Sequence, residues 1–150
     1  MNNKIELIEI TAENWRDVVQ LKVNPEQSRY VTETSYYLLL CHYGDLWHPL
    51  AIQLNKQMIG FVMWAIDPDD NSAWIGGFLI DANWQGKGFG KQAVRAMIDL
   101  LSEKQQINHF ALSVQPENPA LHLYETIGFV KTEDWEGDEI VMRYITHENS

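Results

Sequence analysis

Three glycines stand close together in the stretch F-L-I-D-A-N-W-Q-G-K-G-F-G-K, at positions 86, 88 and 90. An apolar segment typical of a strand precedes them, and apolar residues at helical spacing follow them. Glycine lets backbone N–H groups turn toward an anion without side chains in the way. The N-terminus of the following helix adds a partial positive charge. This arrangement is suited to binding a pyrophosphate group.

Basic residues follow the glycines at a regular spacing. Lys87, Lys91 and Arg95 are four residues apart, so we expect them to share one helix face and to meet further phosphate charge. Two common phosphate loops do not fit. The dinucleotide pattern G-x-G-x-x-G requires glycine where Lys91 stands, and no Gly-Lys-Ser/Thr follows four spacer residues. The pattern that fits is Q-x-x-G-x-G, at Gln85, Gly88 and Gly90, at the end of a predicted strand.

This loop resembles the acetyl-coenzyme A loop of the GNAT superfamily of N-acetyltransferases. A second segment, A-L-H-L-Y-E-T-I-G-F at residues 120–129, is similar to the final helix of that superfamily and the start of the strand after it. It lies about 30 residues downstream, with one predicted strand between the two motifs. The resemblance extends from about Pro49 to the C-terminus and is weaker before that point.

The resemblance implies that acetyl-CoA binds as co-substrate, with its pantetheine arm pairing as an added strand along Phe78, Leu79 and Ile80. Its pyrophosphate would bind the loop formed by Gln85, Gly86, Lys87, Gly88, Phe89, Gly90 and Lys91.

The tyrosine that matches Tyr124 protonates the departing thiolate in enzymes of this superfamily, so Tyr124 is the expected general acid. A thiol with a pKa of about 8.5 and a phenol with a pKa of about 10 can exchange a proton when a hydrogen bond aligns them. The alternative is that Tyr124 only packs in an amphipathic helix with Leu121 and Leu123.

Two positions depart from the pattern of the superfamily. The asparagine usually found seven residues before the tyrosine is replaced by Glu117, and Asn118 follows it. Asn118 is therefore a candidate for cofactor binding, with helix capping as the alternative. The acid often found in the preceding strand is replaced by Gly76 and Gly77, so no general base is identified. Either water relays the proton to another carboxylate, or the amine binds already neutral.

The acceptor is expected from a more diffuse likeness. Residues 24–35, with P-L-A-I from Pro49 and G-F-V-M-W from Gly60, resemble bacterial spermine/spermidine acetyltransferases. A polyamine such as spermine or spermidine is the expected substrate, and Glu26 and Glu33 are the candidate cation-binding residues. Exposed glutamates on helices are usually only solvated. A protein-directed acetyltransferase acting on lysine or N-terminal amines, and a non-catalytic acetyl-CoA-sensing module, are the alternatives.

Composition limits the class of protein further. The 150 residues suit one domain, 1–150, and the formal net charge of −10 without a basic stripe makes nucleic acid an unsuitable partner. The longest apolar stretch, Met58 to Ile66, is far below the roughly 20 residues that span a bilayer. The N-terminus alternates polar and apolar residues, unlike a signal peptide, so we expect a cytoplasmic protein. The sequence is compatible both with a monomer and with a homodimer.

The remaining candidates for chemistry are weak. Acids cluster at 67–70 and 133–139, either as two solvated turns or as a field that attracts a cationic substrate. No metal site is expected, because the calcium-like start at Asp67 lacks the required glycine and closing glutamate, and the histidines show no ligand spacing. Cys41, the only cysteine, is interpreted as a small buried hydrophobe and not as a nucleophile.

The elements that must position these residues follow from periodicity. We expect the order β-α-α-β-β-β-α-β-α-β-β. The strand-helix-strand unit over residues 74–114 requires a parallel pair, because the helix must cross back over the sheet. The predicted class is α/β, with one mixed, mostly antiparallel twisted sheet, a central parallel strand pair and flanking helices, as in the GNAT fold. A helix from Thr11 to about Leu21, a hairpin turn at Lys56-Gln57 and a helix cap at Asn118-Pro119 are among the local expectations.

Overall fold

The computed structural model describes residues 4–146, and the expected order of elements is confirmed. The strands are β1 (Ile5–Glu9), β2 (His48–Leu54), β3 (Gln57–Ile66), β4 (Ala73–Ile80), β5 (His109–Val114), β6 (Val130–Glu136) and β7 (Glu139–Ile145). The helices are α1 (Trp15–Val19), α2 (Thr34–Tyr43), α3 (Phe89–Lys104) and α4 (Ala120–Ile127), with short 3-10 helices at Pro25–Gln27 and Ala82–Trp84. Over these described residues, no helix combines the length and the apolar character needed to cross a bilayer.

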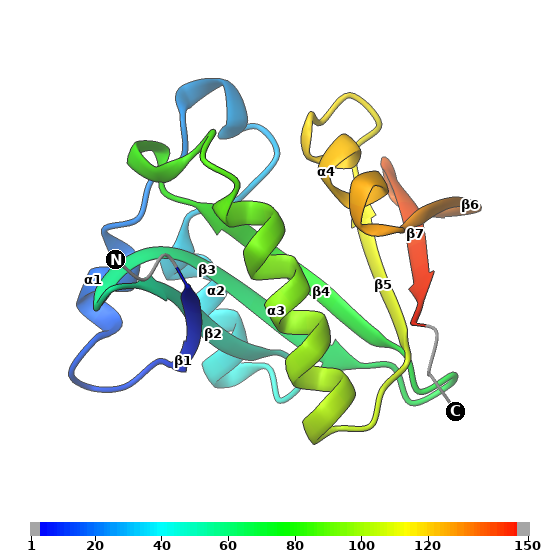
Figure 1. Ribbon diagram of the computed structural model, residues 1–150, viewed down its shortest axis with the longest axis horizontal. Helices are drawn as coiled ribbons and strands as arrows, with labels where there is room; N and C mark the ends of the chain where they lie inside the picture. Colours follow the sequence, from blue (N-terminus) through cyan, green and yellow to red (C-terminus); the bar gives the residue numbers. More distant parts are fainter. Residues whose placement is uncertain (1–3, 147–150) are drawn as a thin grey trace.

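One seven-stranded sheet organises the chain, in the order β1-β2-β3-β4-β5-β7-β6 (Figure 1). Every neighbouring pair is antiparallel except β4 and β5, which run parallel. Helix α3 connects these two strands and crosses over the sheet, as a parallel connection requires. The mixed sheet with a central parallel pair confirms the predicted fold class.

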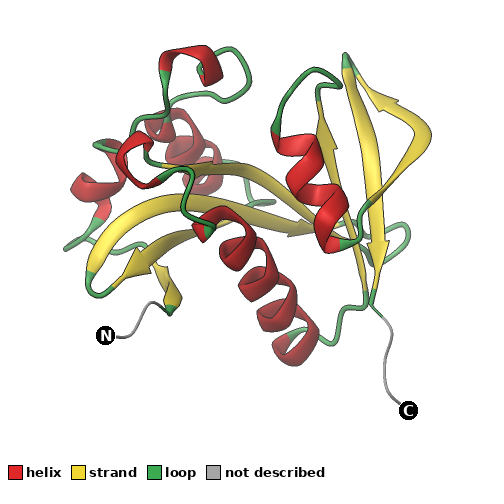
Figure 2. Cartoon of the chain, turned by 45° about the horizontal axis from the view of Figure 1, so that its top comes forward, coloured by secondary structure: helices red, strands yellow, loops and turns green. Residues whose placement is uncertain are grey.

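The helices cover both faces of the sheet (Figure 2). On one face α3 buries an apolar stripe that includes Val94, Met97 and Leu101, and Leu121 of α4 joins the same core. On the other face α1 and the segment up to α2 cover Phe61 and Ala51, with Val18 fully buried. Burial of this apolar surface is the main force that holds the two layers on the sheet.

Strand β4 contains one residue more than the stretch of β3 with which it pairs. At this irregularity β4 is no longer paired with β5. Phe61 pairs with Leu79 and Met63 with Gly76, so three steps along β4 oppose two along β3, which is a β-bulge. Gly77 adopts a φ of 57° there, a conformation that glycine accepts without cost. The pairing between β4 and β5 is confined to Ala73–Phe110 and Trp74–Ala111. Beyond this pair the two halves of the sheet diverge (Figure 2).

Two local expectations need correction. The helix expected from Thr11 begins only at Trp15. The amide oxygen of Asn14 instead accepts a hydrogen bond from the Thr11 N–H at 2.8 Å, which closes a turn before the helix. The hairpin turn lies at Asn55-Lys56, one residue earlier than predicted. Both residues have positive φ, 49° and 69°, as a two-residue turn of type I′ requires, and asparagine tolerates this conformation well.

Candidate active site

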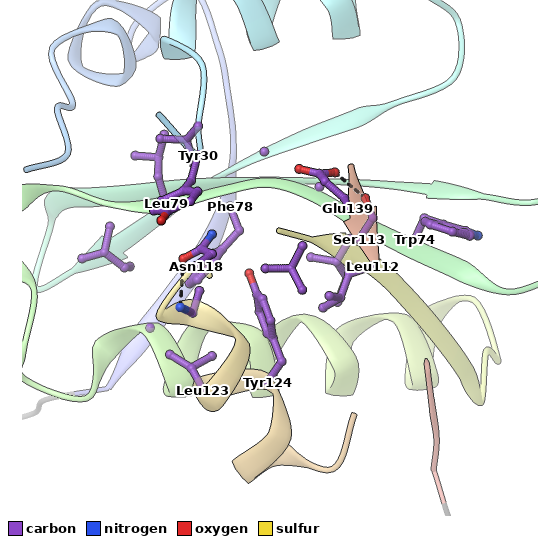
Figure 3. Close-up of a pocket in the computed structure, with 18 of the residues that line it drawn as sticks. Tyr30, Trp74, Phe78, Leu79, Leu112, Ser113, Asn118, Leu123, Tyr124 and Glu139 are labelled. Carbon is purple, nitrogen blue, oxygen red and sulfur yellow. Dashed lines mark hydrogen bonds between the residues drawn. The ribbon is translucent and has the colours of Figure 1, made fainter. Parts of the chain in front are cut away.

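A cavity of about 1000 Å³ opens where β4 and β5 diverge (Figure 3). Its walls come from the glycine loop, the start of α3 and the second half of β4 on one side. The end of β5, α4 and the β6–β7 hairpin form the other side. Most of the predicted site residues therefore lie around one space.

The glycine loop has the shape that a pyrophosphate needs. Gly86 and Gly88 adopt φ values of 76° and 84°, and a Cβ added at either position would meet nothing within 4 Å. Gly88 is the residue before α3, and the first N–H groups of a helix have no acceptor within it, so they are available to an anion at this end. A Cβ at Gly90 would come within 3.2 Å of Leu123, so this glycine allows α3 to approach α4 closely. The loop fits the phosphate end of coenzyme A.

The basic residues near the glycine loop differ in whether they line the cavity. Lys91 lines the cavity, whereas Lys87 precedes α3 and is exposed. The expectation that three basic residues share a helix face is therefore wrong for Lys87, because α3 begins only at Phe89. The Phe89 side chain is buried against Trp84, with ring centroids 6.1 Å apart, so only its backbone is available to a ligand.

The side chain of Gln85 joins separate segments of the chain through hydrogen bonds, a role that the motif did not predict. Its side-chain nitrogen donates to the Gln27 side chain at 2.6 Å and to the Ile80 carbonyl at 2.7 Å. Its side-chain oxygen accepts from the Asn24 amide at 2.7 Å. These bonds tie the segment around Pro25 to the end of β4 and to the glycine loop.

The strand edge proposed for the pantetheine arm lines the cavity along Phe78, Leu79 and Ile80. In the described sheet this part of β4 pairs with β3 on one side and has no partner on the β5 side. An edge of this kind can accept an added extended chain through its backbone groups.

Tyr124 lies in the same cavity, and its hydroxyl points into the open space (Figure 3). Its ring is buried in the core beneath α3, beside Phe78 and Phe129, with centroids 6.5 and 6.1 Å away. Burial raises the pKa of this phenol far above its ordinary value, and the negative charge of Glu139 and the neighbouring Tyr37 raise it further. Tyr124 both packs and presents a hydroxyl that stays protonated.

Asn118 caps α4. Its side-chain oxygen accepts a hydrogen bond from the Ala120 N–H at 2.9 Å, and its carbonyl accepts one from the Leu121 N–H. Asn118 also lines the cavity (Figure 3), so its amide nitrogen is the group that remains available to a ligand. The adjacent Glu117 carbonyl accepts from the Tyr30 hydroxyl at 3.3 Å, which links the two sides of the cavity.

The structure gives a reason for the missing acid on β4. A Cβ at Gly76 would lie 3.0 Å from the ring of Trp47, and one at Gly77 would lie 3.2 Å from the ring of Phe61. Contacts this short require the aromatic rings to move, and Gly77 would also be strained by its positive φ. Trp47 occupies the space that an acidic side chain on β4 would need.

The carboxylates that line the cavity come from the acidic clusters at 67–70 and 133–139, and not from the two glutamates proposed for cation binding. Glu26 and Glu33 are exposed and do not line it, whereas Asp67, Glu136 and Glu139 do. Glu139 belongs to the acidic cluster at 133–139, but its place in the cavity depends on the pairing of β5 with β7, which are distant in sequence. Of the three acids in the turn at 67–70, Asp67 is the one that lines the cavity.

Asp70, in the same turn, has other partners. Hydrogen bonds from Ser72 hold the pKa of its carboxyl below the usual range, and the charge of Arg143, 3.3 Å away, contributes to this.

Cys41 is half-buried and not fully buried as expected, with its sulfur 3.7 Å from that of Met63. Burial raises its pKa to about 11, so roughly one thiol in a thousand is ionised at pH 8.

We expect iodoacetamide to label Cys41 slowly at pH 8 and faster as the pH approaches 11, with the extent of labelling measured by mass spectrometry. Cys41→Ser should leave turnover unchanged. Fast labelling at pH 7 or an inactive serine variant would contradict this assignment.

Comparison with known proteins agrees with the geometry. The model of the acetyltransferase (GNAT) family matches residues 7–129. A spermine/spermidine N(1)-acetyltransferase of Bacillus subtilis is 29% identical over 146 residues, covering 89% of this chain and 94% of that protein.

Solved structures share the fold. A domain from Methanocaldococcus jannaschii aligns with a TM-score of 0.78 at 18% identity, covering 97% of this chain and all of that one. A spermidine N-acetyltransferase from Vibrio cholerae, in complex with CoA and spermine, aligns with a TM-score of 0.72 at 23% identity, covering 95% and 94%. Since the family model spans most of the chain, this protein belongs to the GNAT acetyltransferase family.

Proposed function

We propose that this enzyme transfers the acetyl group of acetyl-CoA to a primary amine of a polyamine such as spermine or spermidine. The observation that carries the proposal is that basic and acidic side chains line different parts of the cavity. Lys91, on α3, is the one basic residue among the described residues that line it. The acids Asp67, Glu136 and Glu139 come from the β3–β4 turn and the β6–β7 hairpin. An anionic donor and a cationic acceptor would thus each meet the opposite charge.

Aromatic rings support a cationic acceptor as well. Tyr30, Tyr37, Trp47 and Trp74 all line the cavity. The faces of such rings attract ammonium groups by about 0.5–2 kcal/mol, and more strongly where water is excluded. They also offer apolar surface to the methylene segments between the charges of a polyamine. The relatives from Bacillus subtilis and Vibrio cholerae, which are named for spermine or spermidine, are consistent with this substrate class.

The roles of the residues follow from their positions. The backbone of the loop at Gly86 and Gly88, with the start of α3, would hold the pyrophosphate, and the edge of β4 would hold the pantetheine arm. Bound acetyl-CoA supplies the thioester that the amine attacks. Tyr124 would then donate its proton to the departing sulfur.

A panel of amines tests the acceptor, with release of the CoA thiol as the measurement. We expect kcat/KM for spermine or spermidine to exceed that of a neutral-bodied monoamine of similar length by about tenfold, because each additional ammonium meets carboxylate or aromatic groups. Added salt should raise KM for the polyamine and leave the monoamine nearly unchanged, since screening shortens to about 8 Å at physiological ionic strength.

The same panel includes a lysine peptide and a peptide with a free N-terminus. Equal rates for monoamines and polyamines, without a salt effect, would contradict the polyamine assignment. A preference for either peptide would indicate a protein-directed enzyme. Binding of acetyl-CoA without thiol release from any amine would indicate a sensing module.

A further inference from the structure

Glu139 and Tyr124 reach the cavity from opposite faces of the sheet. Ser113 on β5 pairs with Val141 on β7, so Glu139, two residues before Val141, shares the face of Ser113. The neighbouring Leu112 and Met142 point to the other face, into the core beneath α3 and α4, which also contains Tyr124. A thioester held between β4 and β5 would therefore have the phenol on one side and the carboxylate on the other.

The carboxylate of Glu139 is held in place. The hydroxyl of Ser113 donates to one oxygen of Glu139 at 2.7 Å (Figure 3), across the pairing of β5 with β7. The carboxylate is half-buried and lines the cavity, so its second oxygen is available to a ligand. The negative charge of Glu139 also raises the pKa of Tyr124, after the larger effect of burial.

Other charged groups near Glu139 favour a cation beside it. Glu136 on β6 is its direct partner in the hairpin, and like charges placed opposite each other repel. Asp67 lines the cavity from the β3–β4 turn. Further along β7, Arg143 is paired with Asp70 and lies 3.3 Å from the ring of His109. An incoming ammonium group would relieve the repulsion between Glu136 and Glu139.

The reaction needs a group that can accept a proton at this position. A primary amine has a pKa of about 10 and is almost entirely protonated at pH 7, so it has no electron pair for attack. The usual position on β4 cannot supply a carboxylate, because Trp47 and Phe61 fill the space next to Gly76 and Gly77. Glu139 lies across the gap between β4 and β5, on the face away from α3, where an amine would approach.

We propose that Glu139 is the proton acceptor that converts the substrate ammonium into a free amine, and that Ser113 positions its carboxylate. The inference rests on the proposed function of the cavity as an amine acetylation site. The ammonium gives one proton to Glu139, which later releases it to solvent. The freed nitrogen forms a bond to the acetyl carbon as the carbon–sulfur bond breaks. The sulfur takes the proton of Tyr124, and the nitrogen returns its second proton to the phenolate, so one proton is released in each turnover.

The test compares Glu139→Gln with wild type across pH 6.5–10, using whichever amine of the panel reacts fastest. We expect kcat/KM to fall about 10²-fold at pH 7, within the range for general base catalysis. The deficit should shrink to about threefold near pH 10, because a large fraction of the amine is then already neutral. Glu133→Gln is the matched control, since it removes an exposed carboxylate from the same hairpin outside the cavity, and its pH profile should follow that of wild type.

Ser113→Ala separates positioning from folding. It should show a smaller loss with the same dependence on pH, at an unchanged melting temperature. If Glu139→Gln does not fold, Glu139→Asp takes its place, because it keeps the charge and shortens the side chain by one carbon.

A deficit of equal size at every pH, or a change in KM alone, would overturn the proposal and leave Glu139 with a binding role only. A polyamine that does not react, while another amine does, would contradict the polyamine assignment but still allow this test. If no amine is acetylated, both proposals fail.

Discussion

Tyr124→Phe is expected to lower the turnover number by about 10²-fold or more, because general acid catalysis typically contributes 10²–10⁴-fold. The substitution removes only the hydroxyl and keeps the ring that packs against Phe78 and Phe129. Without the phenol, the sulfur must leave as an unprotonated thiolate. The affinity for acetyl-CoA and the melting temperature should change little. Steady-state assays and calorimetric titration with acetyl-CoA measure the two effects separately.

The pH profile adds a second criterion. The raised pKa of Tyr124 keeps the phenol protonated while the amine loses its proton, so wild-type activity should not decline between pH 8 and pH 10. The loss in Tyr124→Phe should persist at every pH, in contrast to that in Glu139→Gln. Tyr144→Phe is the control, because Tyr144 packs on Phe129 but does not line the cavity. Full turnover in Tyr124→Phe, with chemistry shown to limit the rate, would mean that the thiolate leaves without this residue.

Gly88→Asp is expected to abolish most of the stabilisation that acetyl-CoA gives to the wild-type protein. Ligand at 100 times its dissociation constant contributes about 2.7 kcal/mol, which corresponds to a rise of roughly 5–10 °C in melting temperature for a chain of this size. The aspartate would place a negative charge in the open space above Gly88, where the pyrophosphate must bind. Thermal unfolding with and without acetyl-CoA measures the change.

The free protein should tolerate this substitution. A Cβ at Gly88 meets nothing within 4 Å, and an aspartate before the first turn of α3 interacts favourably with the helix N-terminus. The φ of 84° costs about 1–2 kcal/mol for a residue other than glycine. Gly88→Asn is the matched control, with almost the same shape and strain but no charge, so it should retain more of the ligand effect. Undiminished acetyl-CoA affinity in Gly88→Asp would show that the phosphates bind elsewhere.

The cavity combines residues from both ends of the chain, and hydrogen bonds hold these parts together. Gln85 links the glycine loop to Asn24 and Gln27, and Tyr30 reaches Glu117 at the opposite wall. Loops carry binding residues most effectively when a rigid scaffold positions them. These hydrogen bonds join residues 24–30 to the glycine loop and to the opposite wall of the cavity.

Local sequence predicted the elements and the residues that we propose for the donor side of the site. The apolar residues at helical spacing after the three glycines predicted α3, because a helix brings residues three and four apart onto one face. Gly86 and Gly88 indicated a phosphate loop because positive φ favours glycine. Asn118 and Pro119 indicated the start of α4 through the preference for a cap. Each signal depends on neighbours within a few residues, so a single sequence contains it.

The acceptor side was decided only by tertiary structure. Glu139 enters the cavity because β7 pairs with β5 in one register, and a shift of one residue would turn its side chain to the other face. Trp47 excludes an acid at Gly76 because its ring, from the segment before β2, lies 3.0 Å from the position of a Cβ there. Glu26 and Glu33, which only a diffuse resemblance had suggested, are exposed outside the cavity. Pairing between distant strands depends on how the whole sheet buries its two faces, and no short stretch of sequence encodes that choice.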